Sequence, residues 1–123
     1  MPQTKIIKNQ LTLPEFEELH SLVDTTYART IEIKVPRATL WRLNADNRTM
    51  RGKLPPNHAT ARPVTKGLMY PQGSSDLVDA AIANAPRKNS KLVAIDKKIV
   101  LHMLIDHSVL IGKLEDIGYE VND

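Results

Sequence analysis

The feature that most constrains the fold is a stretch rich in proline and glycine at residues 52–75. It contains four of the eight prolines and three of the five glycines of the chain. Proline lacks a backbone N–H and clashes with the preceding helical turn, and glycine favours turns, so a continuous helix or a central strand is not expected to cross this stretch. A connection of this length in a compact domain is typically functional or disordered. We therefore expect a mobile loop over residues 52–75.

The basic side chains of the chain gather in and before this loop. The formal net charge of the whole chain is only +3. Residues 29–66, however, carry nine lysines and arginines against two acidic residues, a balance of +7. Such an asymmetry is typical of a surface that contacts phosphate groups or an acidic partner.

Length and composition indicate one soluble globular domain, residues 1–123. With 41% hydrophobic residues, the chain can bury a sizeable core without further support. The absence of cysteine excludes disulfides, zinc–thiolate sites and cysteine nucleophiles. The N-terminus lacks the apolar core of a signal peptide, and the most apolar stretch, residues 99–105, is far shorter than a membrane span of about 20 residues. We expect a cytoplasmic protein that does not contact a membrane.

The spacing of hydrophobic residues changes along the chain and predicts a single α+β domain. Residues 13–27 place apolar residues at helical spacing, whereas residues 30–35 alternate strictly, as in a strand with one buried face. The same criteria predict further helices at 75–85 and 97–117 and further strands at 91–95 and 119–121. The predicted fold is three helices packed on a short sheet, together with the long Pro/Gly-rich basic loop.

Local capping signals mark the ends of two of these helices. Thr12 and Glu15 are spaced as a capping box, in which each side chain accepts the backbone N–H of the other residue. Asp96 is a suitable N-cap for the last helix, and Gly118 suits the left-handed residue that ends it. These residues predict helix boundaries and carry no information about function.

Residues 37–51 leave two interpretations open. Ala38, Trp41 and Ala45 would form one stripe of a helix, whereas residues 40–43 would also fit a short strand. Trp41 is the only tryptophan of a chain that is poor in aromatic residues, and we interpret it as a core residue. The sequence shows no internal repeat.

Motifs for catalysis are scarce. The five glycines are too dispersed to cradle phosphate, and the common nucleotide-binding, metalloprotease and hydrolase signatures are missing. His20 and Asp24 are four residues apart, as are His102 and Asp106, and we interpret both as surface pairs in preference to oriented general bases. His102 and His107 lie about 140° apart on a helix and cannot share a metal ion. We therefore predict no catalytic residue, no metal site and no cofactor.

The functional prediction rests on the basic centre. Six of its nine basic residues are arginines, whose planar guanidinium group suits bidentate contacts with phosphate or carboxylate. We predict that the partner is bound by Arg37, Arg42, Arg48, Arg51, Lys53, Arg62 and Lys66. The favoured hypothesis is a small, non-enzymatic regulatory protein that binds nucleic acid through them. The alternatives are an adaptor or inhibitor that docks on an acidic protein surface, and an unrecognised phosphate-handling enzyme.

Overall fold

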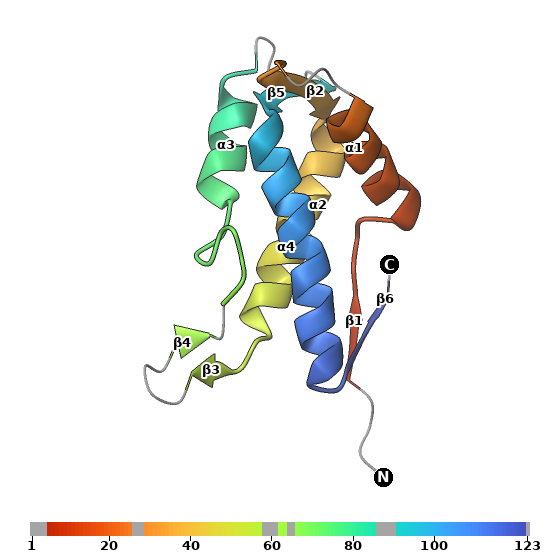
Figure 1. The fold of residues 1–123 in the computed structure, drawn as a ribbon, viewed down its shortest axis with the longest axis vertical. Coiled ribbons are helices and arrows are strands. Elements are labelled where there is room, and N and C mark those ends of the chain that lie inside the picture. Colours follow the sequence, from red (N-terminus) through yellow and green to blue (C-terminus); the bar gives the residue numbers. More distant parts are fainter. Residues whose placement is uncertain (1–4, 26–28, 58–61, 64–65, 86–90, 123) are drawn as a thin grey trace.

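The computed structural model describes residues 5–25, 29–57, 62–63, 66–85 and 91–122, with only the backbone described at 56–57 and 62–63. The elements along these residues are β1 (Lys5–Lys8), α1 (Leu13–Thr25), β2 (Glu32–Pro36), α2 (Arg37–Gly52), β3 (Pro56–Asn57), β4 (Arg62–Pro63), α3 (Ser75–Ala83), β5 (Leu92–Asp96), α4 (Lys97–Asp116) and β6 (Tyr119–Asn122). The helices α2 and α4 pack against each other along the long axis of the molecule, and α1 and α3 flank them on opposite sides (Figure 1).

The structure confirms the α+β class and adds a helix to the prediction. The three predicted helices correspond to α1, α3 and α4, and the predicted strands to β2, β5 and β6. Residues 37–52 form the additional helix α2, which buries Leu40, Leu43 and Met50 completely. The prediction of three helices is therefore wrong. Packing of one face of α2 against α4 accounts for the helix, which the local pattern alone left open.

Within the described residues, the strands form three separate pairs and no continuous sheet. β2 and β5 pair antiparallel, β1 and β6 pair parallel, and β3 and β4 pair antiparallel. The sequence did not indicate β1, because Ile7 is the only buried residue among its four and no alternation is visible. The short β3–β4 pair lies within the predicted loop of residues 52–75. Part of this loop is outside the described residues, and its mobility stays a prediction.

The β2–β5 pair lies at the centre of an internal pseudo-twofold symmetry. The middle residues of the two strands, Lys34 and Ala94, lie opposite each other and are 60 positions apart in the sequence. The backbone N–H of Arg37 donates to the carbonyl oxygen of Lys91 at 2.8 Å, and the bond from residue 97 to residue 31, at 2.7 Å, repeats it with the same offset. In a twofold interface, a contact between residue i of one subunit and residue j of the other is repeated between residue j of the first and residue i of the second. The two halves of the chain therefore pack as the subunits of a dimer do.

The helices α2 and α4 extend this symmetry at the same offset of 60 residues. Each begins directly after its strand, and the capping residues Pro36 and Asp96 have nearly the same backbone angles (φ −59°, ψ 127° and φ −56°, ψ 128°). Buried residues recur at the corresponding positions Leu40 and Val100, Leu43 and Met103, Met50 and Leu110, and Leu54 and Leu114. The prediction that the chain contains no internal repeat is therefore wrong.

A buried aspartate recurs in both halves and fixes the segment that leads into a neighbouring helix. Asp46 of α2 accepts the backbone N–H groups of residues 10 and 11, at 2.9 and 2.8 Å, just before α1. Asp106 of α4 accepts those of residues 69 and 70, at 2.6 and 2.9 Å, ahead of α3. Each aspartate is followed after five residues by the tripeptide Gly-Lys-Leu. This short pattern is the sequence signal of the repeat.

Two apolar clusters fill the interior, and a polar layer separates them along α2 and α4. One cluster surrounds the β2–β5 pair, and the other joins the C-terminal halves of α2 and α4 to Ile7 of β1. Between them, the two helices bury Asp46, Asn47, Asp106 and His107. Asn47 and His107 occupy corresponding positions and contact each other, with 3.0 Å between Oδ1 of the first and Nδ1 of the second. The pseudo-twofold axis thus passes through the β2–β5 pair and also close to the contact between Asn47 and His107.

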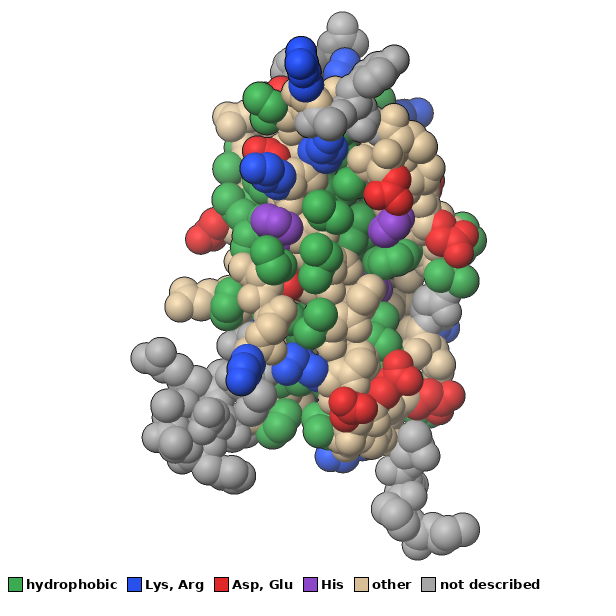
Figure 2. All heavy atoms as spheres, viewed as in Figure 1, with side chains coloured by type: hydrophobic (Ala, Val, Ile, Leu, Met, Phe, Trp, Pro, Cys, Tyr) green, Lys and Arg blue, Asp and Glu red, His purple; other side chains and the backbone are tan. Residues whose placement is uncertain are grey.

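The outward side of α4 is largely apolar. Figure 2 looks onto this helix and shows hydrophobic side chains gathered over its middle. Ile105 is 38% exposed, and Leu101 and Val109 are half-buried. None of the described helices is long and apolar enough to cross a membrane.

Candidate nucleic-acid interface

The predicted basic residues of α2 lie on different sides of that helix. At 100° per residue, Arg37, Trp41 and Arg48 fall within about 40° of one another on the outward side. Arg42 projects about 100° away from Trp41 and contacts α1. Arg51 instead lies against Gly73, ahead of α3. The outward side of α2 therefore combines two cations with an aromatic ring.

An open groove crosses the N-terminal half of α2. It has a volume of about 720 Å³ and is lined by Gln10, Pro36, Arg37, Ala38, Trp41, Arg42, Ile82 and Lys91. We call it the Trp41 groove. Three of these lining residues carry a positive charge and none carries a negative charge. A concave surface of one charge sign concentrates ligands of the opposite sign, so the Trp41 groove favours anions.

Trp41 is 50% exposed, and its interpretation as a core residue is wrong. The helix turns Leu40 and Leu43 toward the interior, where both are completely buried, so the outward side with the indole faces the groove. An accessible indole offers a flat surface on which a nucleic-acid base can stack.

Glu15 of α1 holds Arg42 at the edge of the groove. Nε of Arg42 donates to Oε2 of Glu15 at 3.1 Å, and its Nη2 also contacts this oxygen. Burial raises the pKa of Glu15, but hydrogen bonds from Arg42 and Thr12 outweigh this effect, so that the pKa lies below its ordinary value. The carboxylate stays charged at neutral pH and offsets the charge of Arg42. This carboxylate therefore weakens Arg42 as an anion-binding group.

Arg51 has a structural partner. Its guanidinium atoms lie 2.6–3.0 Å from the point that a Cβ atom on Gly73 would occupy, so the guanidinium covers the backbone of that glycine. Burial lowers the pKa of Arg51, the charge of Arg48 lowers it further, and the carboxylate of Asp106 acts in the opposite direction. Any larger residue at position 73 would displace this side chain.

The remaining predicted residues lie beyond the far end of α2. Lys53 is exposed about 24 Å along the helix axis from Arg37, and Lys66 is exposed as well. The side chain of Arg62 lies outside the described residues. The structure thus brings Arg37 and Arg42 to one groove, places Arg48 and Arg51 further along α2, and leaves Lys53 just past the C-terminal end of that helix.

Lys91 is a groove residue that the sequence did not indicate. It precedes β5 and lies outside the basic stretch of residues 29–66. Its carbonyl oxygen accepts the N–H of Arg37, and the antiparallel pairing of β2 with β5 therefore brings it beside the start of α2. Without that pairing, no local pattern distinguishes Lys91 from other lysines.

The two predicted histidine–carboxylate pairs differ in outcome. His20 and Asp24 form the predicted surface pair, with 3.0 Å between Nδ1 and Oδ2 and with both side chains more than half exposed. His102 does not pair with Asp106, whose carboxylate accepts backbone N–H groups instead. Nδ1 of His102 lies 3.4 Å from the hydroxyl oxygen of Tyr70. Burial raises the pKa of Tyr70, and the charges of Asp106 and Asp96 raise it further, so its hydroxyl remains protonated.

The described part of the chain offers little for other chemistry. Within it, no group of three or more histidine, aspartate or glutamate side chains is arranged to hold a metal ion. The fourth histidine of the chain, His58, falls outside the described residues. Comparison of the chain with family models, curated proteins and solved structures gives no match.

Proposed function

We propose that the protein binds single-stranded nucleic acid in the Trp41 groove and performs no chemistry of its own. The observation that carries this proposal is a half-exposed tryptophan in a groove whose described lining includes three cations and no acidic residue. A base would stack on the indole ring, and the adjacent phosphates would contact Arg37 and Lys91. Arg48, which lies on the same side of α2, would extend the path of the backbone by a further phosphate.

A single strand is favoured over a duplex because stacking on a side chain requires an unpaired base. Proteins that bind single strands combine a positive groove with aromatic platforms, and stacking contributes about 1–3 kcal/mol per base. This groove contains one such platform, Trp41. We therefore expect an affinity that is modest and strongly dependent on salt, since each phosphate contact adds about −0.7 to the slope of log K against log salt.

The fluorescence of Trp41 tests the proposal directly, because no other tryptophan is present in the chain. Single-stranded DNA and RNA of about 12 nucleotides should quench this fluorescence, and rising salt should restore it. Replacing Trp41 with phenylalanine should keep most of the affinity in an anisotropy assay with a labelled strand, whereas alanine should weaken it about tenfold or more. Lys113→Ala, a cation outside the groove, is the matched control and should bind like the parent.

Polyglutamate separates this proposal from docking on an acidic protein surface. If polyglutamate competes as well as the oligonucleotide at equal charge, and Trp41→Ala binds both normally, the groove recognises charge alone. That result would favour the adaptor or inhibitor hypothesis. Equal affinity of the parent and the Arg37→Ala, Lys91→Ala double variant for the oligonucleotide would contradict both.

A further inference from the structure

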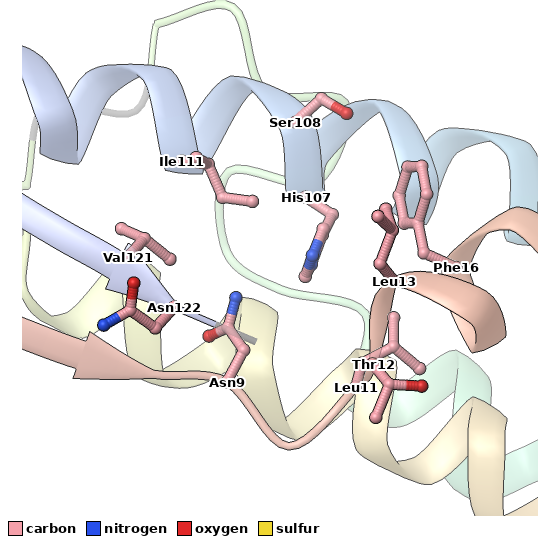
Figure 3. Close-up of a pocket in the computed structure, with 10 residues that line it drawn as sticks. All are labelled: Asn9, Leu11, Thr12, Leu13, Phe16, His107, Ser108, Ile111, Val121 and Asn122. Atoms are coloured by element: carbon pink, nitrogen blue, oxygen red, sulfur yellow. The ribbon is translucent and has the colours of Figure 1, made fainter.

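A small pocket lies between α4 and the segment that joins β1 to α1. Figure 3 shows it from the side, with residues of α4, β6 and this segment pointing toward a common space. Its volume is about 230 Å³, and it is lined by Asn9, Leu11, Thr12, Leu13, Phe16, His107, Ser108, Ile111, Val121 and Asn122. We call it the His107 pocket. It shares no residue with the Trp41 groove, and none of its lining residues carries a full charge at neutral pH.

Asn9 lines the pocket and has one unpartnered hydrogen-bond acceptor, which neighbouring atoms cover almost completely. Its side chain is only 6% exposed. Nδ2 contacts Sδ of Met50 at 3.8 Å, but Oδ1 makes no hydrogen bond with the described residues. It is the one buried side-chain oxygen or nitrogen among those residues without a partner. Such an atom destabilises a protein unless it is satisfied.

His107 supplies an acceptor to the pocket, because its hydrogen bond to Asn47 determines the tautomer. Nδ2 of Asn47 donates to the carbonyl oxygen of Met103 at 2.9 Å, which turns Oδ1 toward the imidazole. Oδ1 can only accept, so the proton lies on Nδ1 of His107, 3.0 Å away, and Nε2 carries a lone pair. Burial lowers the pKa of His107 against an opposing effect of Asp46, so the ring stays neutral at pH 7.

The rest of the pocket is apolar. Leu11, Leu13, Phe16, Ile111 and Val121 form most of its wall. The ring of Phe16 lies against that of His107, with 5.3 Å between the centroids. A ligand that suits this pocket is uncharged and mostly apolar, and it carries an O–H or N–H group for the acceptor of His107. A cavity of about 150 Å³ already accommodates benzene, so 230 Å³ fits a single substituted ring.

From this match of shape and polarity, we propose that the His107 pocket binds a small neutral phenol-like molecule whose hydroxyl donates to His107 Nε2. The other half of the chain does not repeat the residues that line this pocket. At the positions that correspond to His107 and Ile111, it has Asn47 and Arg51. Arg51 covers Gly73 there, so the symmetry of the fold does not by itself create the cavity.

The test compares 4-methylphenol with toluene, which has the same shape without the hydroxyl. Calorimetric titration of the intact protein should show about tenfold tighter binding of 4-methylphenol, as expected for one hydrogen bond to an otherwise unsatisfied buried acceptor. His107→Phe removes the acceptor at similar volume and should bring the two affinities close together while toluene still binds. Ser108→Ala is the control, because Ser108 lies at the rim and points away from the pocket (Figure 3), and it should preserve the preference.

Ile111→Phe provides an independent arm that keeps the acceptor of His107 and fills the pocket. It should abolish binding of both probes without changing oligonucleotide binding at the Trp41 groove. Failure of the parent to bind 4-methylphenol at millimolar concentration would overturn the proposal. So would equal binding of the two probes by the parent, or binding that persists unchanged in Ile111→Phe.

Discussion

The outward sides of α2 and α4 have the same place in the fold and opposite chemistry. Trp41, Arg48 and Thr49 on α2 correspond to Leu101, Ser108 and Val109 on α4. The positions that are buried in both helices, by contrast, are apolar in both or aspartate in both, except for the pairs Asn44 and Leu104, and Asn47 and His107. The pattern of buried residues therefore determines this fold, whereas the outward positions are free to differ. Of these two helices, α2 is the one that presents an aromatic ring among cations.

The largest effect is expected where the two halves are alike, at the buried aspartates. Asp46→Ala and Asp106→Ala each leave two backbone N–H groups without their carboxylate acceptor. Each should lower the free energy of unfolding by about 3 kcal/mol in urea denaturation, since hydrogen bonds to charged groups contribute about 1.5–3 kcal/mol. The exposed Asp24→Ala should change it by less than about 0.5 kcal/mol. If only one of the two variants lost much of its free energy of unfolding, the two halves would be alike in structure but not in what their aspartates contribute to stability.

A second variant gives α2 the side chain of its counterpart. Trp41→Leu copies Leu101 of α4 and should weaken binding of single-stranded oligonucleotides about tenfold, because the stacking surface is lost. Thermal stability should change little, since the indole is half exposed. Leu101→Ala is the matched change on α4 and should leave oligonucleotide binding unaltered. Equal losses in the two variants, measured by anisotropy, would show that the two sides do not differ in function.

A smaller effect is expected from the cations at the start of each helix. Arg37 lies in the Trp41 groove, whereas the corresponding residue Lys97 does not. Arg37→Ala should reduce the slope of log K against log salt by about 0.7, the value for one phosphate contact with a single strand. Lys97→Ala should leave that slope unchanged. Identical slopes for both variants would place the binding surface elsewhere.

The smallest effect concerns pH and the contact between His107 and Asn47. Burial lowers the pKa of His107 in the folded protein, with Asp46 opposing, whereas the unfolded chain has an ordinary histidine pKa of about 6.5. As the pH falls below about 6.5, the unfolded state binds a proton that the folded state does not, and stability declines until the lowered pKa is reached. Urea denaturation between about pH 7 and pH 5.5 should show this decline. His107→Gln should show a shallower one, because the other groups titrate in both proteins.

Features that depend on neighbouring residues were predictable from the sequence. The capping box is present, with Glu15 N–H donating to Thr12 Oγ1 at 3.3 Å and Thr12 N–H donating to Glu15 Oε1 at 3.2 Å. Asp96 caps α4 by accepting the N–H of Lys98 at 2.8 Å. Gly118 has a φ of +99° after the end of α4, as its position predicted. Each of these contacts joins residues close in sequence, so a local pattern is sufficient to indicate it.

Features that depend on distant segments were not predictable. The exposure of Trp41 depends on which side of α2 meets α4, and Lys91 reaches the groove through the β2–β5 pair. Asp106 looked like a partner for His102, yet it accepts N–H groups from residues more than 30 positions earlier. The His107 pocket combines residues from both ends of the chain. In each case, the decisive contact joins segments that the sequence does not show to be neighbours.

The pairing of β1 with β6 has a consequence for the order of folding. Lys5 pairs with Tyr119, so this contact closes a loop that includes nearly the whole chain, and closing a longer loop costs more entropy. During synthesis, β1, which contains Ile7, can pair only after β6 has left the ribosome. The β2–β5 pair needs a shorter stretch of chain and can form earlier. We therefore expect the wall of the His107 pocket that Val121 provides to be assembled last, after most of the interior is in place.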